Sequence, residues 1–395
     1  MRKPTSEGTA MTTPQDYTVA VYYFPNYHPN PRNDETHGPG WTEWELVRAA
    51  RPRYPGHRQP RVPLWGCQDE ADPTVMAQKI AAAADHGVGA FIFDWYWYED
   101  GPFLERALER GFLGAPNHDR LKFAVMWANH TWIDIHPARL RECRQHAYPV
   151  LYPGGISRQT FEAAARHCIA HYFQHPSYWQ IDGAPYFSIY DLPEMIRGLG
   201  GFEAARDAFA WFRAATRAAG FRDLHLNQVY WNHGVLPGEQ ALRDPNHLLT
   251  GLGFDSITSY VWIHHAPLTA FPETDYRAVQ QDYLTFWDRV EREIALPYFP
   301  NASMGWDSSP RTVQSDAFEN AGYPFTPVLA GNTPERFKAA LQEIKTRMDR
   351  AGTKILTVNA WNEWTEGSYL EPDTLYGMGY LEAIRDVFTQ APGPA

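Results

Sequence analysis

Eight short apolar runs recur along this chain, and most are followed by an amphipathic stretch. Within each run the apolar residues are largely continuous rather than alternating, which is typical of strands buried on both faces. The runs are VAVYYFP (19–25), GAFIFDWYW (89–97), KFAVMWAN (122–129), PYFSIYD (185–191), LHLNQVYW (224–231), DSITSYVW (255–262), PYFPNASMGW (297–306) and KILTVNAWNEW (354–364). This pattern favours a parallel sheet covered by helices.

The segments between the runs have helical patterns. The first begins with Asp72 as a candidate N-cap and Pro73 in the first turn, and it ends at Gly87. Similar stretches occupy 157–173, 201–220, 275–294 and 333–352. The segment after the fifth run is rich in Gly and Pro, and its helix is poorly marked. Eight strands alternating with helices favour an α/β fold, a single (β/α)8 TIM barrel, over a doubly wound sheet.

We expect one barrel domain over residues 17–395, because no low-complexity linker divides the chain after Tyr17. The polar residues 1–16 are predicted to be a disordered lead. They lack the apolar segment of a secretory signal, and no run of about 18 apolar residues exists to cross a membrane. The prediction is therefore a cytoplasmic protein without a membrane span. Its oligomeric state cannot be inferred from the sequence.

Charge and cysteine content argue against other classes of protein. The formal net charge of −11 disfavours a nucleic-acid partner, which would need a basic face. Cys67, Cys143 and Cys168 are scattered without CxxC spacing, and the histidines show no HxxxH or HExxH pairing. Nothing resembles a Gly-rich phosphate cradle. We therefore expect no disulfide framework, no metal site and no cofactor.

Nearly every run ends in an aromatic residue beside a carboxylate, amide or imidazole. In a barrel of this class the active site lies at those carboxyl ends. Aromatic rings suit the apolar faces and hydroxyl edges of sugars, although the aromatics, 15% of the chain, could also simply pack. Because side chains alternate along a strand, one of each neighbouring pair is expected to face the outer layer. The candidate sugar-binding residues are Tyr23, His28, Asp94, Trp95, Trp97, Asn129, His130, Trp231, Asn232, Trp262, Trp306, Trp361 and Trp364.

The end of the last run contains two glutamates, Glu363 and Glu366, three residues apart. If the chain turns helically there, their Cβ atoms are roughly 5–6 Å apart. Two carboxyl groups around one glycosidic bond can divide the work, one as acid and the other as base or nucleophile. The apolar walls of Trp361 and Trp364 would raise the pKa of the more buried acid. Alternatively, the glutamates cap a helix or pair with arginines.

Three long motifs carry a resemblance to a known group. They are VAVYYFPNYHP with GPGWTEWELVRAARPRYPGHRQPRVPLWG, the GAFIFDWYW strand, and AWNEWTEGSYLEPD with YGMGYLEAIRD. The chain after Tyr17 resembles the bacterial family-99-like glycoside hydrolase proteins called WbsX-like, which are often encoded with O-antigen genes. More distantly it is similar to the family 99 endo-α-mannosidases and mannanases, whose W/F-N-E-W-x-E-G motif falls on Trp361–Gly367 here.

The resemblance implies a retaining mechanism. Glu363 would deprotonate the sugar's own 2-hydroxyl, which attacks C1 to give a 1,2-anhydro sugar. Glu366 would protonate the leaving oxygen and then activate water. This route needs a 2-hydroxyl trans to the leaving group, as in α-manno and α-rhamno sugars. Tyr260 falls on an active-site tyrosine of the family and would orient Glu363 or polarise the 2-hydroxyl.

The chain departs from family 99 after its first strand, where it has GWTEWELV (40–47), and this adds Glu43 and Glu45 to the candidates. Trp41 of the same segment is a further candidate for binding the sugar. The first functional interpretation is a retaining hydrolase of an α-linked manno- or rhamno-type oligo- or polysaccharide. A second is a glycosyltransferase or transglycosylase in surface-polysaccharide biosynthesis, although no nucleotide-sugar DxD motif stands at a strand end. A third, a non-catalytic carbohydrate-binding barrel, would leave the glutamate pair without a role.

Overall fold

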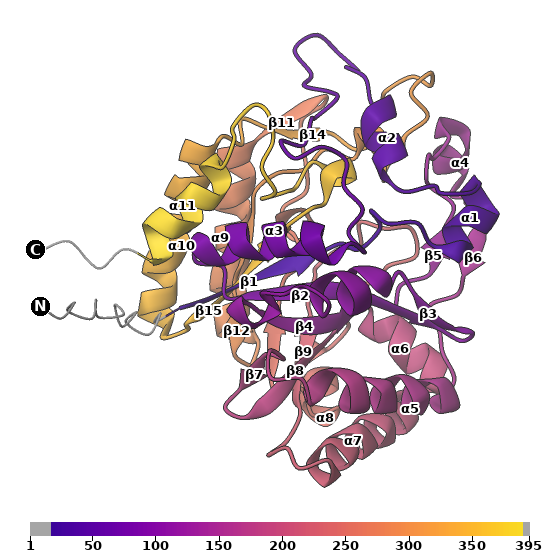
Figure 1. Cartoon of the computed structure of the whole chain (residues 1–395), viewed down its shortest axis with the longest axis vertical. Coiled ribbons are helices and arrows are strands. Elements are labelled where there is room, and N and C mark those ends of the chain that lie inside the picture. Colours follow the sequence, from indigo (N-terminus) through magenta and orange to yellow (C-terminus); the bar gives the residue numbers. More distant parts are fainter. Residues whose placement is uncertain (1–16, 390–395) are drawn as a thin grey trace, which may run out of the picture.

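Parallel strands at eight positions form the centre of the molecule, in a computed structural model that describes residues 17–389 (Figure 1). All eight predicted strands are present. They are β1 (Thr18–Tyr23), β2 (Ala90–Tyr98), β4 (Lys122–Trp127), β8 (Ala184–Ile189), β9 (His225–Val229), β10 (Ser256–Thr258), the pair β12 (Tyr298–Phe299) and β13 (Asn301–Ser303), and β15 (Ile355–Asn359). The predicted TIM-barrel fold is confirmed.

The barrel closes through its seventh position, which Pro300 splits into β12 and β13. The hydrogen-bonded order is β12-β10-β9-β8-β4-β2-β1-β15-β13, so the path begins and ends on the two halves of one strand. Proline has no N–H to donate to a neighbouring strand, which explains the interruption. Its carbonyl still accepts a hydrogen bond from the backbone N–H of Thr357 at 2.9 Å. The nine short strands therefore occupy eight positions.

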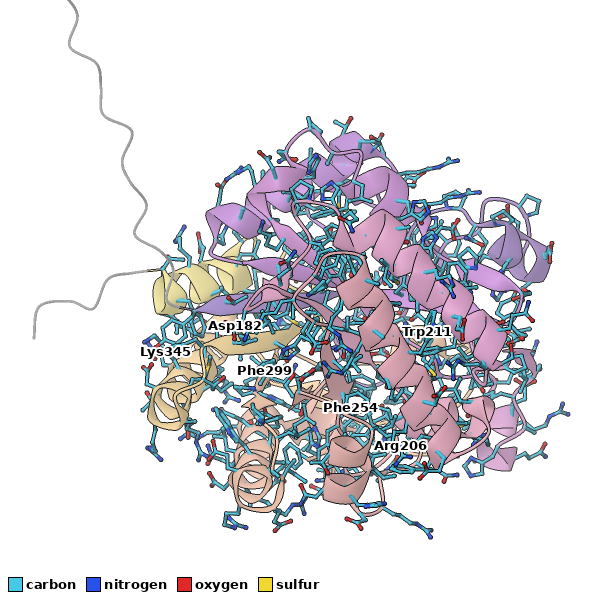
Figure 2. The ribbon with its side chains drawn as sticks, turned by 90° about the horizontal axis from the view of Figure 1, so that it is seen from below. Asp182, Arg206, Trp211, Phe254, Phe299 and Lys345 are labelled. Atoms are coloured by element: carbon cyan, nitrogen blue, oxygen red, sulfur yellow. The ribbon has the colours of Figure 1, made fainter. Side chains whose placement is uncertain are left out.

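Helices surround the barrel, and the five that were predicted are all present. In Figure 2 the exposed Arg206 lies on an outer helix, whereas the buried Phe299 lies in the interior. The helices that follow barrel strands are α3 (Pro73–Asp85), the π-helix η1 (Ala107–Phe112), α5 (Arg158–His167) with its π-helical continuation η3 (Cys168–Phe173), α6 (Leu192–Leu199), α7 (Phe202–Ala218), α8 (Pro245–Gly251), α9 (Tyr276–Glu293), α10 (Pro334–Ala351) and α11 (Gly379–Phe388). The poorly marked helix after the fifth strand is the short α8.

Local capping sets the start of α3 as predicted. Oδ1 of Asp72 accepts a hydrogen bond from the backbone N–H of Thr74 at 2.7 Å, and Pro73 occupies the first turn. The N–H that proline lacks would have no partner in a first turn. Helix α3 ends at Asp85, two residues before the predicted glycine. Lys79 lies on the buried face of this helix.

Smaller helices and strands lie at the two ends of the barrel. They are the helices α1 (Pro31–His37), α2 (Trp44–Ala49) and α4 (Leu140–Gln145), the paired strands β5 (Trp132–Ile133) and β6 (Val150–Tyr152), the paired strands β11 (Glu273–Asp275) and β14 (Val328–Ala330), strand β3 (Gly101–Phe103) on β2, strand β7 (Gln180–Ile181) on β8, and the 3-10 turns η2 (His118–Arg120), η4 (Trp262–His264), η5 (Ser309–Arg311) and η6 (Trp364–Glu366). In Figure 1, α1, α2 and α4 lie together on the right of the molecule.

The predicted disordered lead, residues 1–16, lies outside the described residues, and the single-domain boundary at 17–395 stays a prediction. Within residues 17–389, no helix is both long and apolar enough to cross a membrane.

Candidate active site

The segment after β15 turns so that Glu363 and Glu366 lie on the same side of the chain. Residues Trp364–Glu366 form the 3-10 turn η6, and the backbone N–H of Glu366 donates to the carbonyl of Glu363 at 3.1 Å. In a 3-10 turn, side chains at positions i and i+3 are eclipsed. Both glutamates are buried and both line one pocket at the carboxyl end of the barrel. The helical turn assumed from the sequence is therefore present.

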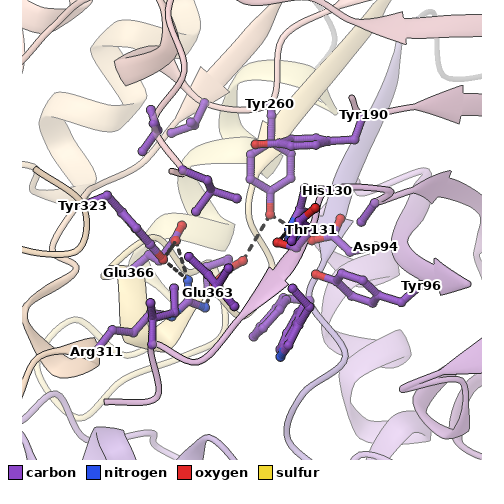
Figure 3. Close-up of a pocket in the computed structure, with 18 of the residues that line it drawn as sticks. Asp94, Tyr96, His130, Thr131, Tyr190, Tyr260, Arg311, Tyr323, Glu363 and Glu366 are labelled. Atoms are coloured by element: carbon purple, nitrogen blue, oxygen red, sulfur yellow. Dashed lines mark hydrogen bonds and ion pairs between the residues drawn. The ribbon is translucent and has the colours of Figure 1, made fainter. Parts of the chain in front are cut away.

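A single arginine joins the two glutamates (Figure 3). Nη2 of Arg311 lies 3.2 Å from Oε2 of Glu363, and its Nη1 lies 2.5 Å from Oε1 of Glu366. The hydroxyl of Tyr323 donates to the same oxygen of Glu366 at 2.7 Å and also contacts the guanidinium. The planar fork of an arginine suits this arrangement, because it presents several N–H groups in fixed directions.

Behind Arg311 lies a third carboxylate, Glu43. Its Oε1 accepts from Nε of Arg311 at 2.7 Å and from the hydroxyl of Thr365, and its Oε2 accepts from Nδ2 of Asn26 at 2.9 Å. Burial alone would raise the pKa of Glu43, but Arg311 and these donors hold it below its usual value. Glu43 is therefore a carboxylate that fixes Arg311. We call Arg311, Glu43, Glu363 and Glu366 the pocket cluster.

The two glutamates of the pocket cluster that face the pocket ionise less readily than a free glutamate. Burial raises the pKa of Glu363 well above its usual range, the nearby charge of Glu366 adds to this, and Arg311 opposes it. Burial also raises the pKa of Glu366, while Arg311 and Tyr323 partly offset the effect. Two close carboxyl groups release their protons in two steps that belong to the pair. Between those steps the pair carries one proton, as acid–base catalysis requires.

Tyr260 connects the pocket cluster to Asp94, which lies within β2. Its hydroxyl oxygen lies 3.1 Å from Oε1 of Glu363 and 2.9 Å from Oδ2 of Asp94. Burial raises the pKa of Asp94 well above its usual range. In Figure 3, Tyr260 extends toward the space between these two carboxyl groups.

Aromatic and apolar residues complete the pocket wall. Burial lowers the pKa of His136 to about 3, so this ring is neutral at pH 7. The remaining lining residues are Phe24, Tyr96, Met126, Ala128, His130, Thr131, Trp132, Ile133, Ile135, Tyr190, Val235, Leu236, Val261, His264, Trp306 and Tyr323. A wall that combines aromatic rings with a few polar groups is suited to a small-molecule or sugar ligand.

The structure brings six of the sequence-predicted site residues to this pocket, namely Glu363, Glu366, Tyr260, Asp94, His130 and Trp306. Four others lie one layer away. Glu43 holds Arg311; Trp41 stacks on His37 at 4.1 Å between ring centroids; Trp231 packs on Tyr190 at 4.8 Å; and the backbone N–H of Asn232 donates to the carbonyl of His264 at 3.1 Å.

The other candidates lie elsewhere, and the pocket geometry does not support a substrate contact for them. Along β2, Asp94 and Tyr96 face the pocket, so Trp95 and Trp97 both face the outer layer, where their rings are 5.3 Å apart. Three candidates pack on other rings: Tyr23 on Phe93, Trp361 on Phe91 and Trp364 on Tyr369. Three others face the backbone: the ring nitrogens of His28 face two carbonyls, Asn129 exchanges hydrogen bonds with Asp191, and Nε1 of Trp262 donates to the carbonyl of Asn301.

Sequence reasoning missed Arg311, Tyr323, Tyr96 and Tyr190. Tyr96 lies two residues after Asp94 on one strand, so strand alternation could have placed it on the same face. Tyr190 directly follows a strand, which is also a usable signal. Arg311 and Tyr323 lie in the long connection between β13 and β14, and no spacing in the sequence links them to Glu363.

A second group of buried charges lies on the other side of the 361–366 segment. Nζ of Lys79 is 2.6 Å from Oε1 of Glu70 and 2.9 Å from Oε1 of Glu371, and none of the three lines the pocket. We call Lys79, Glu70 and Glu371 the enclosed cluster. Burial, opposed by Lys79, raises the pKa of Glu70 to about 7.

Two side chains of the WNEW segment bind the enclosed cluster. Nδ2 of Asn362 donates to Oε1 of Glu70 at 2.8 Å and to the carbonyl of Phe24 at 2.6 Å, while its Oδ1 accepts from the N–H of Phe24 at 2.8 Å. Nε1 of Trp364 donates to Oε2 of Glu371 at 2.8 Å. These contacts fix the residues immediately before and after Glu363.

Among residues 17–389, no group of three or more His, Cys, Asp or Glu side chains has the arrangement of a metal site.

Comparison with known proteins now adds a family. The model of the family Glycosyltransferase WbsX matches residues 19–384. Among curated proteins, the chain is 28% identical over 400 residues to the uncharacterized protein WxcX of Xanthomonas campestris pv. campestris (strain B100), covering 98% of this chain and 52% of that protein. The WxcX protein of strain ATCC 33913 is similar, with 28% identity over 391 residues. The chain thus spans about half the length of these relatives.

Solved structures share the fold. The GH99 endo-alpha-mannosidase from Bacteroides thetaiotaomicron has a TM-score of 0.54 and 15% identity, with 95% of this chain and 97% of that chain covered. A structure described as a glycoside hydrolase-like protein has a TM-score of 0.57 and 15% identity, covering 99% and 98% of the two chains.

Proposed function

The chain belongs to the Glycosyltransferase WbsX family, and from this premise we propose that it is a retaining glycoside hydrolase of α-linked manno- or rhamno-type bonds. One observation carries the proposal: Glu363 and Glu366 face one pocket from a single 3-10 turn and are bridged by one guanidinium. The fold shared with a GH99 endo-alpha-mannosidase supports the same class of bond. The substrate is an oligo- or polysaccharide.

In the proposed mechanism, Glu363 accepts the proton of the sugar's 2-hydroxyl. The freed oxygen attacks C1 and forms the O2–C1 bond as the bond from C1 to the leaving oxygen breaks. Glu366 donates its proton to that leaving oxygen. In the second half, Glu366 takes a proton from water, the water oxygen attacks C1 as the O2–C1 bond breaks, and O2 regains its proton from Glu363. Two inversions at C1 give net retention.

The hydrogen-bond donors around Glu363 suit a base, whereas those around Glu366 do not by themselves mark it as the acid. Glu363 receives hydrogen bonds from Arg311 and faces Tyr260, both of which stabilise a carboxylate. Glu366 also has two donors, Arg311 and Tyr323, which stabilise its charged form. A raised pKa nevertheless lets one of the pair keep a proton near neutral pH. The assignment of acid and base therefore needs its own test.

The charge of the pocket favours hydrolysis over transfer from a nucleotide sugar. A diphosphate needs cations, and the one guanidinium among the described lining residues is already bound to three carboxylates of the pocket cluster. Asp94 adds a further acidic group. Transfer between neutral glycans, a transglycosylase reaction, uses the same carboxylate pair and is the second candidate. The family description, which names a glycosyltransferase, supports a transfer reaction without specifying the donor.

The decisive experiment incubates the protein with α-manno- and α-rhamno-oligosaccharides and follows products by NMR. Release of the α-anomer first, and its loss in the Glu363→Gln and Glu366→Gln variants, supports the proposal. Retained cleavage in both variants contradicts it. New, longer glycans in the presence of an acceptor identify transglycosylation.

Aryl glycosides assign the roles of the two glutamates. A good leaving group needs no proton, so the variant of the acid keeps much of its first-step rate on such a substrate, whereas the variant of the base does not. We expect Glu366→Gln to be rescued and Glu363→Gln not to be. The reverse result exchanges the two roles.

A further inference from the structure

The phenol of Tyr260 lies between two carboxyl groups, and its proton cannot serve both. The phenol oxygen is 2.9 Å from Oδ2 of Asp94 and 3.1 Å from Oε1 of Glu363 (Figure 3). A phenol has one proton to donate. Both contacts have hydrogen-bond length. One of the two carboxyl groups therefore carries a proton of its own and donates it to the phenol oxygen.

The surroundings of the two carboxyl groups decide where this proton lies. Oε2 of Glu363 accepts from Arg311, which favours the charged form of Glu363. Asp94 has no ion-pair partner within residues 17–389, and its Oδ1 is buried without a hydrogen-bond partner. An unpaired carboxylate in such a place costs several kcal/mol, whereas the acid form avoids most of this cost. The proton therefore belongs on Asp94.

The other groups around Asp94 lead to the same result. They are Tyr22 on β1, Tyr96 on β2, Tyr260 after β10, Arg311 in η5, and Glu363 and Glu366 after β15. Burial raises the pKa of all three tyrosines, so they stay neutral. The negative charge of the glutamate pair disfavours a further negative charge on Asp94. The guanidinium is already shared among the three carboxylates of the pocket cluster.

We propose that Asp94 is a neutral carboxylic acid at pH 7 and positions Glu363 through Tyr260. The acid donates to the phenol oxygen, and the phenol donates to Glu363, with no proton transferred in the resting protein. Two donors, Tyr260 and Arg311, then oppose the burial that raises the pKa of Glu363, and they hold its carboxylate form, the base of the proposed mechanism, in one orientation. The catalytic meaning rests on the proposed function, whereas the place of the proton does not.

Infrared spectroscopy of the free protein tests the place of the proton without any substrate. In a difference spectrum between the unaltered protein and Asp94→Asn at pH 7, we expect the loss of one carboxylic-acid C=O band. Asp307→Asn is the matched control, because Asp307 is equally buried but its pKa is held below its usual value despite burial, by His57 and Arg61. That variant should lose carboxylate bands instead. Loss of carboxylate bands in Asp94→Asn would overturn the proposal.

Kinetics test the positioning role. An asparagine at 94 is neutral, can donate from its amide to the phenol oxygen and keeps its carbonyl. We therefore expect Asp94→Asn to keep kcat within about 10-fold, unlike Glu363→Gln, which should lose roughly 10²–10⁴-fold.

In the unaltered protein, ionisation of Asp94 at alkaline pH would draw the phenol proton away from Glu363. The alkaline limb of kcat/KM should therefore move to higher pH or vanish in Asp94→Asn. An Asp94→Asn variant as inactive as Glu363→Gln, or with an unchanged alkaline limb, would refute the positioning role.

Discussion

The pocket cluster and the enclosed cluster are built from the same parts, yet only one of them faces a cavity. Each has a buried cation with more carboxyl groups than it can neutralise, three around Arg311 and two around Lys79. The segment that contains Asn362, Glu363 and Trp364 lies between them and contacts both. The two clusters therefore show what an excess of buried carboxyl groups does in two different surroundings.

The two clusters differ in whether their carboxyl groups face a cavity that a ligand can enter. In the enclosed cluster, protein atoms surround Lys79 and Glu70, so a proton on Glu70 has only a structural effect. In the pocket cluster, Glu363 and Glu366 line a cavity where a ligand can exchange a proton with them. The choice of cation fits this division, because an arginine fork fixes several carboxylates in direction, whereas a lysine acts as a point charge. In the proposed function, only the buried charges that face the pocket take part in catalysis.

The largest predicted effect is a loss of turnover that a variant of the pocket cluster shows and a variant of the enclosed cluster does not. Glu366→Gln should lower turnover by roughly 10²–10⁴-fold, because it removes an acid–base group. Its free energy of unfolding at pH 7 should stay the same or rise, because burial of this carboxyl group is costly in the folded protein. Turnover and urea denaturation measure the two quantities on the same preparation.

The matched control for that prediction is Glu70→Gln in the enclosed cluster. It also replaces a buried glutamate whose pKa is raised, but its turnover should stay within a few-fold of the unaltered protein. If Glu70→Gln lost as much activity as Glu366→Gln, the two clusters would not differ in the way proposed.

The next effect is on stability. Lys79→Met leaves Glu70 and Glu371 buried without their cation, and breaking a buried ion pair in this way costs about 3–5 kcal/mol. Urea denaturation should show this loss. Adding Glu371→Gln to Lys79→Met should recover part of it, because one uncompensated carboxylate is removed. A Lys79→Met protein of unchanged stability would mean that the enclosed cluster contributes nothing to the fold.

Most of the barrel could be predicted from the sequence, because most strands lie in largely apolar runs and each major helix repeats its apolar residues at helical spacing. The site could be predicted mainly where polar residues lie within a strand or soon after it, as at Asp94, Tyr260 and Glu363. Arg311 could not, since it comes from a long connection between β13 and β14 whose course depends on tertiary packing. The enclosed cluster was equally hidden, because Lys79 looks like an ordinary polar residue of an amphipathic helix. Aromatic residues were overpredicted as sugar contacts, since most of them pack in the core.

The smallest predicted effect is the pH dependence of stability that comes from Glu70. Its pKa is raised to about 7 in the folded protein, against a usual value near 4.3 in the unfolded chain. Between those values the folded state holds a proton that the unfolded state has lost. Stability from this group is therefore fully present at acidic pH and declines as pH rises toward 7.

For a single group the decline is at most about 1.4 kcal/mol per pH unit. Urea denaturation at several pH values between 5 and 7 measures the slope. Glu70→Gln cannot ionise, so its stability should fall less steeply than that of the unaltered protein over this range. Glu366, Glu363 and Asp94 also have raised pKa values and add slopes of the same sign, which Glu70→Gln leaves in place. Parallel curves for the two proteins would show that Glu70 is ionised throughout this pH range. Lys79 would then neutralise the enclosed cluster more fully than Arg311 neutralises the pocket cluster.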